Sequence, residues 1–175
     1  MLNIDTTTML IELTRGDSAS IVFSAKQKDG KTYIPTVGNS LVFAVAKKVG
    51  ATPLFTVDTA LEEVPTDYVE VTITEEEFNL QKDMYYTESG GVYTQCTEAD
   101  TFDENETYYI LDYSEFWTIQ ITRNKWLDDD GNDKFKFWDY VWDLQLTTET
   151  GADTIIGKTS TISPTFRVLG EVAEE

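Results

Sequence analysis

The side chains best suited to chemistry in this sequence are carboxylates. The 175-residue chain has 32 acidic residues and no histidine, which excludes Ser-His and Cys-His nucleophiles and histidine-bearing metal sites. Its one cysteine, Cys96, has no base beside it and is interpreted as a half-buried thiol on a strand. Paired carboxylates could act as general acid and base, but so many acidic residues bring some pair together in any fold. We therefore expect no catalytic residues, no cofactor and no enzymatic activity.

The densest acidic group is Asp128-Asp-Asp-Gly-Asn-Asp133. Asp128, Asp130 and Asn132 have the alternate spacing of the oxygen ligands in a calcium loop. The glycine stands at the fourth position of that frame, where an EF-hand needs it at the sixth, and flanking helices are not predicted. The segment is interpreted as a solvated hairpin turn. Calcium binding remains the alternative. A metal-dependent hydrolase is a third hypothesis, and its activity would have to be abolished by chelation and by changing Asp130.

Aromatic side chains are a second group that could bind a ligand. Flat rings stack on sugar rings, and carboxylates accept hydrogen bonds from sugar hydroxyls. The same rings also form cross-strand pairs in small sheets and anchor protein interfaces. Packing, a protein interface and a glycan site all remain open for them. The residues concerned are Tyr85, Tyr86, Tyr93, Tyr108, Tyr109, Phe116 and Trp117. Trp138, Tyr140 and Trp142 alternate regularly and are predicted to lie in the core.

The net charge of −19 limits the partners. Such a field repels nucleic-acid phosphates and anionic lipids, so neither nucleic acid nor a membrane is expected as a partner. A cation or a basic protein surface fits the charge better. The N-terminal residues lack the basic start and apolar core of a secretory signal, and no apolar run is long enough for a membrane helix. Synthesis and assembly in a cytoplasm is the expectation, with a final location outside the cell left open if the protein leaves as part of a particle.

Short runs in which apolar and polar residues alternate, separated by Gly, Asn and Asp, predict strands joined by turns. Arg15-Gly16-Asp17 is interpreted as a turn, although these letters also spell an integrin-binding tripeptide. Thr74-Glu-Glu-Glu77 is a capping-box pattern that predicts a short helix, and residues 124–126 predict a single turn. Ser89-Gly-Gly91 predicts the turn of a hairpin. Strands are predicted within 10–14, 18–26, 41–48, 53–57, 68–74, 107–111, 118–122, 140–146, 154–162 and 166–169, and a hairpin within 84–97.

These elements predict an all-β fold: an Ig-like antiparallel β-sandwich with a small β-hairpin insertion and one or two single-turn helices. The strand at 41–48 is apolar on both sides, which favours a central position in a sheet. The expected organisation is an N-terminal arm (1–8), a discontinuous sandwich (9–81 and 115–170), an inserted β subdomain (82–114) and an acidic tail (171–175).

Two groups of segments carry a resemblance to a known family. The order of Ile11-Glu-Leu-Thr-Arg-Gly-Asp17, a Phe-centred strand, Asp29-Gly30, Leu41-Val-Phe-Ala-Val-Ala-Lys47 and Leu54-Phe55 resembles the N-terminal domain of phage upper-baseplate proteins and of their small relatives in phages and prophages of gut bacteria. Thr118-Ile-Gln-Ile-Thr122, Tyr140-Val-Trp-Asp-Leu-Gln-Leu146 and Thr154-Ile-Ile-Gly157 resemble the closing strands of that family. The insertion looks like a module that recurs in phage structural proteins. The chain departs from the family by carrying this insertion and by having no C-terminal fibre or coiled-coil extension.

The resemblance implies a non-enzymatic virion structural protein, in the tail or baseplate or else as capsid decoration. Its expected partners are other virion proteins, including copies of itself in a symmetric assembly. The alternative is a carbohydrate-binding or host-adhesion module that uses the aromatic insertion. The residues expected to contact the partner are Tyr85, Tyr86, Tyr93, Tyr108, Tyr109 and Trp117.

Overall fold

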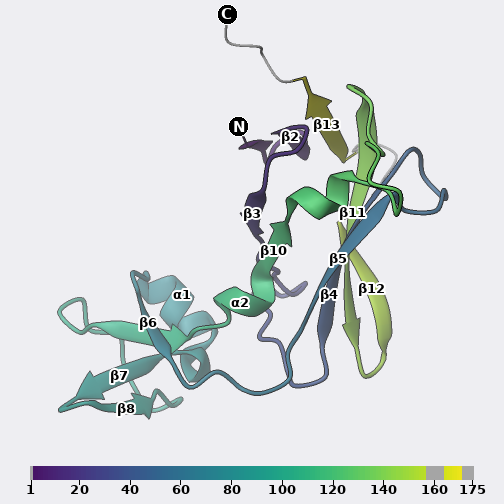
Figure 1. The fold of residues 1–175 in the computed structure, drawn as a ribbon. Coiled ribbons are helices and arrows are strands. Elements are labelled where there is room, and N and C mark those ends of the chain that lie inside the picture. The colour runs from purple at the N-terminus through teal and green to yellow at the C-terminus, as the bar shows by residue number, and fades with distance from the viewer. Residues whose placement is uncertain (1, 157–163, 171–175) are drawn as a thin grey trace, which may run out of the picture. The chain divides into compact units, whose positions relative to one another are not determined.

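The computed structural model describes residues 2–156 and 164–170, which form two compact units (Figure 1). The larger unit comprises Met1–Phe23, Gly38–Leu61 and Phe116–Glu175, and the smaller comprises Ser24–Val37 and Glu62–Glu115. Both units are built mainly from strands, and their few helices are short. The predicted all-β, sandwich-like fold is confirmed.

The larger unit contains a seven-stranded sheet and a two-stranded sheet. β3 (Ala19–Val22) and β10 (Thr118–Ile121) form the small sheet. α2 (Ser114–Trp117) precedes β10, and η2 (Arg123–Trp126) follows it. In order, the large sheet contains β1 (Leu2–Asp5), β2 (Leu10–Thr14), β13 (Thr165–Leu169), β11 (Asp139–Thr148), β4 (Ser40–Ala46) and β5 (Phe55–Ala60), and β12 (Gly151–Ile156) also pairs with β11. Among the described strand pairs only β13 and β2 are parallel, whereas an antiparallel sandwich was predicted.

Alternation along the strands builds the core of the larger unit. Every second residue of β4 and β11 faces inward, and β4 is an interior strand between β11 and the edge strand β5, whereas a central position was predicted. The Phe43 ring is fully buried and lies 5.5 Å from the Trp142 ring, centroid to centroid. The inward rings and aliphatic side chains are Leu41, Phe43, Val45, Tyr140, Trp142, Leu144, Leu146, Phe55, Trp126, Phe135 and Phe166.

The prediction that Trp138 lies in the core is wrong. Its side chain is 65% exposed. β11 begins only at Asp139, and the preceding residues bend, with the Trp138 amide donating to the Lys136 carbonyl oxygen. The Tyr140 hydroxyl also contacts the Lys136 backbone, which holds this bend in place. The alternation of Tyr140 and Trp142 therefore does not extend back to Trp138.

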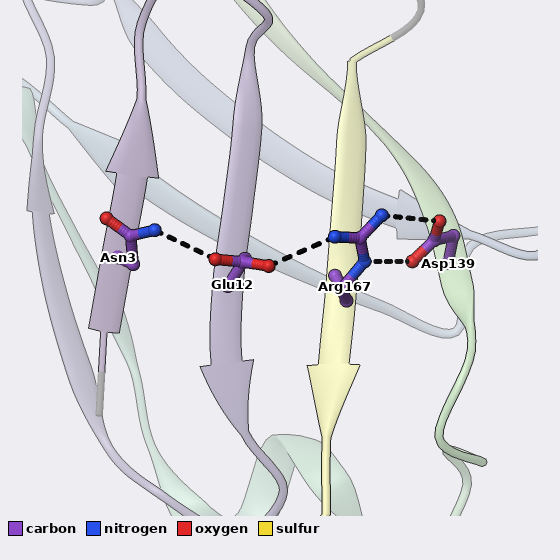
Figure 2. A network of polar contacts seen from close by, with 4 residues as sticks. All are labelled: Asn3, Glu12, Asp139 and Arg167. Atoms are coloured by element: carbon purple, nitrogen blue, oxygen red, sulfur yellow. Dashed lines mark hydrogen bonds and ion pairs between the residues drawn. The ribbon is translucent and has the colours of Figure 1, made fainter.

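A polar network joins four neighbouring strands of the large sheet (Figure 2). Asn3 Nδ2 donates to Glu12 Oε2 at 2.8 Å, and Arg167 binds both Glu12 and Asp139, with its Nε donating to Asp139 Oδ1 at 2.7 Å. These hydrogen bonds from Arg167 lower the pKa of Asp139. The network fixes the register of β13 between β2 and β11. Residues 2–5, predicted as part of an arm, are therefore a paired edge strand.

The smaller unit contains a four-stranded antiparallel sheet. Its strands, in spatial order, are β6 (Tyr68–Val71), β9 (Tyr108–Leu111), β7 (Tyr86–Ser89) and β8 (Val92–Gln95). α1 (Glu75–Leu80) and η1 (Lys82–Met84) connect β6 to β7. Gly90 and Gly91 make the predicted hairpin turn, with φ angles of 61° and 83° that favour glycine. The predicted capping box is present: Thr74 and Glu77 bind each other's backbone amides.

This unit is broader than the insertion predicted at 82–114. β6 belongs to it because β6 pairs with β9. α1 belongs to it because Phe78, which is fully buried, packs with Tyr85, Cys96 and Tyr108. The predicted acidic tail at 171–175 and the part of the predicted 154–162 strand beyond Ile156 lie outside the described residues.

Candidate functional site

One face of the smaller sheet carries a tyrosine from every strand. In the register, Tyr86 of β7 lies opposite Tyr109 of β9, and Tyr93 of β8 lies opposite Glu88. Cross-strand partners share a face, so these side chains point the same way. Tyr68 on β6 joins them, because its ring contacts both Tyr86 and Tyr93. We call Tyr68, Tyr86, Tyr93 and Tyr109 the tyrosine face.

The four rings form one continuous cluster. The Tyr68 and Tyr93 rings come from the two edge strands and are stacked, with centroids 3.9 Å apart and planes 8° apart. Tyr86 meets Tyr68 edge-on at 5.0 Å, and Tyr109 meets Tyr93 edge-on at 5.1 Å. Stacked and edge-to-face contacts are the favourable geometries of aromatic pairs. The cluster therefore presents a preorganised aromatic surface rather than four independent rings.

The opposite face of the same sheet is the core of the unit. Tyr85 and Tyr108 are only 7% and 4% exposed and pack on Phe78. In each Tyr-Tyr pair, one ring faces the core and the other belongs to the tyrosine face, because neighbouring residues of an extended chain point to opposite sides. The expectation that Tyr85 and Tyr108 lie in a contact surface is therefore corrected.

The expectation that Trp117 contacts a partner is also corrected, and its neighbour Phe116 takes the packing role that was left open for it. Both lie in α2, both are buried, and their rings pack edge-on at 5.0 Å within the larger unit. Of the six residues predicted to contact a partner, the structure brings Tyr86, Tyr93 and Tyr109 together on one accessible face. Tyr93 is 36% exposed, and the other two are half-buried. The prediction missed Tyr68. Alternation along its strand could have identified it, because Val71 is predicted to face inward and Tyr68, three residues earlier, then points to the opposite side.

The tyrosine face is acidic. Glu70 lies opposite Tyr109 and Glu88 lies opposite Tyr93, so both carboxylates share the face with the rings. Burial, with the Glu70, Tyr93 and Glu88 side chains nearby, raises the pKa of the Tyr109 phenol. Residues 62–115 contain sixteen acidic residues and one basic residue, Lys82. The face thus offers aromatic rings, neutral phenol donors and negative charge.

The calcium candidate forms a turn. Asp128 Oδ1 accepts hydrogen bonds from the amides of Asp130 and Asn132 at 3.0 and 2.8 Å, and Asp128 N donates to Asn132 O. A bridge between Leu127 and Asp133 closes the turn. The Asp128 carboxylate is engaged by its own loop. Within residues 2–156 and 164–170, no group of three or more Cys, Asp or Glu side chains is placed to hold a metal ion.

Cys96 is more deeply buried than predicted. It directly follows β8 and is part of the core cluster with Phe78, Tyr85 and Tyr108. Burial, with Asp100 and Glu106 nearby, raises the pKa of the Cys96 thiol, so the reactive thiolate is disfavoured.

No helix within the described ranges is long and apolar enough to cross a membrane. Comparisons with protein-family models, with curated proteins and with solved structures gave no match.

Proposed function

We propose that the chain is a non-enzymatic structural protein of a bacteriophage particle, a tail or baseplate component that binds neighbouring virion proteins through the tyrosine face. The observation that carries the proposal is the gathering of Tyr68, Tyr86, Tyr93 and Tyr109 on the face that the core of the smaller unit does not use. Tyrosine is enriched at protein interfaces because it supplies a large rigid contact area and a polar hydroxyl.

The place in a phage particle is inferred from the sequence resemblance. The segments around Ile11–Asp17, Leu41–Lys47 and Tyr140–Leu146 carry that resemblance. In the structure they correspond to β2, β4 and β11 of one sheet, in which β4 pairs with β11 and β13 lies between β11 and β2. A tail or baseplate position is favoured over capsid decoration because the resemblance is to upper-baseplate proteins. Such a protein would be assembled in the cytoplasm of the bacterial host and retained in the virion.

A protein partner is favoured over a glycan by the ring geometry. Sugar recognition by stacking needs an open ring face, whereas Tyr68 and Tyr93 use one face of each ring on each other, at 3.9 Å. The edges and hydroxyls of the cluster remain available, and these suit the mixed polar and apolar contacts of a protein interface. Glycan binding is retained as an outcome of the test.

The test is incorporation into particles. In a phage or prophage strain that encodes the chain, a tagged copy should be found in purified particles at a fixed ratio to the major tail protein. The variant Tyr93→Ser/Tyr109→Ser removes two rings of the cluster and should reduce incorporation at least about tenfold, the scale of losing one strong interface contact. Circular dichroism and a cooperative melt would verify that the variant is folded.

Trp138→Ser is the matched control. Trp138 is an exposed aromatic residue of the larger unit and lies outside the tyrosine face, so the variant should be incorporated like the unmodified chain. Absence of the chain from particles would contradict the proposal, and so would normal incorporation of the double variant. Binding to a glycan array that disappears in the double variant would favour the adhesion function instead.

A further inference from the structure

The smaller sheet ends in a strand whose outer edge is open. β8 is the last strand in the order β6-β9-β7-β8 and pairs with β7 alone among the described strands. All four of its residues are exposed. An edge strand with unpaired backbone groups is a template onto which another strand can add.

The hydrogen-bond pattern identifies the backbone groups that are open. Cys96 N donates to Tyr85 O at 2.8 Å, so the Cys96 amide points toward β7. Backbone groups alternate in direction along a strand, and the pairs therefore place the amides of Thr94 and Val92 on the β7 side as well. The amides and carbonyls of Tyr93 and Gln95 point outward, to the free edge. No described residue bonds to these four groups.

In the larger unit, lysine side chains cover the comparable edge strand. β5 ends its sheet, and two lysines bind the backbone there: Lys125 Nζ donates to Thr56 O at 2.9 Å, and Lys134 Nζ donates to Leu54 O at 3.2 Å. Lysine side chains over an edge prevent another strand from pairing with it. Among the described residues no lysine binds the backbone of β8, and the lysine of the 62–115 segment, Lys82, binds the carbonyls of Glu98 and Asp100.

The charge around β8 selects the kind of strand that can add. Tyr93 lies opposite Glu88, and Glu70 lies on the same face. A strand added beside β8 would run about 4.8 Å away, with its side chains opposite Tyr93 and Gln95. An arginine at that position can reach across β8 toward the Glu88 carboxylate. A second copy of the smaller unit would bring the same negative charge and be repelled.

We infer that β8 accepts an extended, arginine-bearing segment of a neighbouring protein as a fifth strand of the smaller sheet. The inference rests on the proposed function, since it specifies the partner of the tyrosine face. Backbone hydrogen bonds at Tyr93 and Gln95 supply the pairing. Glu70 and Glu88 on the tyrosine face select cationic side chains at alternate positions.

The first experiment uses a capped hexapeptide that alternates arginine with threonine, titrated into the full chain by calorimetry. A matched peptide with glutamate in place of arginine is the control. We expect binding of the arginine peptide alone, weakened by added salt. By amide exchange in NMR, the Tyr93 and Gln95 amides should be protected at least about tenfold at saturation, whereas Thr94, already bonded to Thr87, should change little.

Two variant pairs separate the edge from the charge. Gln95→Pro removes the outward amide without breaking the hairpin ladder, and Gln95→Ala is its control, since it loses the same side-chain contact to Asp83 O but keeps the amide. Glu70→Gln/Glu88→Gln removes the charge on the tyrosine face, and Glu76→Gln removes a charge from α1. We expect Gln95→Pro and the double glutamine variant each to weaken peptide binding about tenfold, and both controls to bind like the unmodified chain.

Three results would overturn strand addition: no binding of the arginine peptide, equal binding of the glutamate peptide, or binding without protection of Tyr93 and Gln95. The proposed function is tested separately by particle incorporation. If Gln95→Pro is incorporated normally while Tyr93→Ser/Tyr109→Ser is not, docking through the tyrosine face stands and strand addition fails. If the chain is absent from particles, the proposed function fails whatever the peptide does.

Discussion

The two units of this chain use different aromatic residues. All four tryptophans and seven of the nine phenylalanines belong to the larger unit, whereas eight of the nine tyrosines belong to the smaller one. In the larger unit the two sheets enclose an interior in which Phe43, Phe166 and Trp126 are nearly inaccessible to water. In the smaller unit only one face of the sheet is covered, by α1 through Phe78.

The difference shows how the architecture of each unit determines which type of aromatic residue it contains. A closed interior accepts wholly apolar rings and the indole of Trp126, whose N–H donates to Asp17 O. A sheet with one solvent-exposed face suits tyrosine, because the ring can pack against other rings while the hydroxyl stays in contact with water. Aromatic residues therefore stabilise the fold in the larger unit, and in the smaller unit they also form a surface. The separation gives each unit its own spectroscopic reporter: tryptophan emission for the larger and near-ultraviolet tyrosine signals for the smaller.

The largest expected effect is that of Phe43→Ala in the larger unit. Phe43 is fully buried and contacts the rings of Phe23, Phe55, Trp142 and Phe166. Truncation should lower the free energy of unfolding by about 3–5 kcal/mol, measured by urea denaturation followed through tryptophan emission. Val22→Ala, at a 68% exposed position of the same unit, is the control and should change little. A loss below about 1 kcal/mol would contradict the assigned core.

Phe78→Ala tests whether the smaller unit has a core of its own. Phe78 is fully buried, and its ring contacts Tyr85, Phe102 and Tyr108. We expect a loss of about 3 kcal/mol, seen as an earlier transition of the near-ultraviolet tyrosine signal with the tryptophan transition unchanged. If both signals shift together, the two units unfold cooperatively and the comparison between them loses its energetic meaning.

Thr74→Ala tests the capping box at the start of α1. The variant removes the hydroxyl that accepts from the Glu77 amide at 3.2 Å and breaks the reciprocal contact. The expected loss is about 1 kcal/mol, confined to the tyrosine signal. Thr74→Ser keeps the hydroxyl and should recover most of that stability. An equal loss in both variants would show that the methyl group, and not the cap, matters.

The smallest effect is expected at the Arg167 network. Its members are partly exposed, so Arg167→Met should lower the melting temperature near neutral pH by only about 2–4 °C. Arg167 lowers the pKa of Asp139 below the ordinary value of 3.8. The stability from this pair is therefore present at higher pH and is lost as the pH falls through the lowered pKa.

The acid dependence provides the check for this last prediction. Melting temperatures of the two proteins should converge below pH 3.8, where the Asp139 carboxyl becomes protonated. Asp139→Asn should give a similar pH profile, because it removes the other partner of the same pair. A difference between Arg167→Met and the unmodified chain that persists unchanged in acid would indicate that packing of the arginine stem, and not its charge, is responsible.

Local patterns in the sequence were enough to predict many elements. The alternation from Tyr140 to Leu146 predicts a core strand, Gly90-Gly91 predicts a hairpin, and Thr74 with Glu77 predicts a capped helix; all three are present. Pairing between distant segments was not predictable, because alternation does not say which strand lies alongside. The pairing of β6 with β9 decides that Tyr68 joins the tyrosine face.

The division of the two Tyr-Tyr pairs between core and surface follows from the same pairing. Alternation alone predicts that Tyr85 and Tyr86 point in opposite directions. It does not predict which of them faces α1, because that depends on which side of the sheet Phe78 covers. Three of the six residues predicted to contact a partner, Tyr86, Tyr93 and Tyr109, lie on the tyrosine face, and which three do so depends on tertiary contacts.

The position of β13 has a consequence for biosynthesis. Glu12 and Arg167, which bind each other across β2 and β13, are 155 residues apart in the chain. β1 and β2 are translated well before β13, the strand that joins them to β11. Contacts between residues so far apart in the sequence slow folding. Until β13 pairs with β2, the β1–β2 hairpin has an unpaired strand edge. The large sheet can therefore close only after β13 has been translated, and chains terminated before β13 cannot complete it.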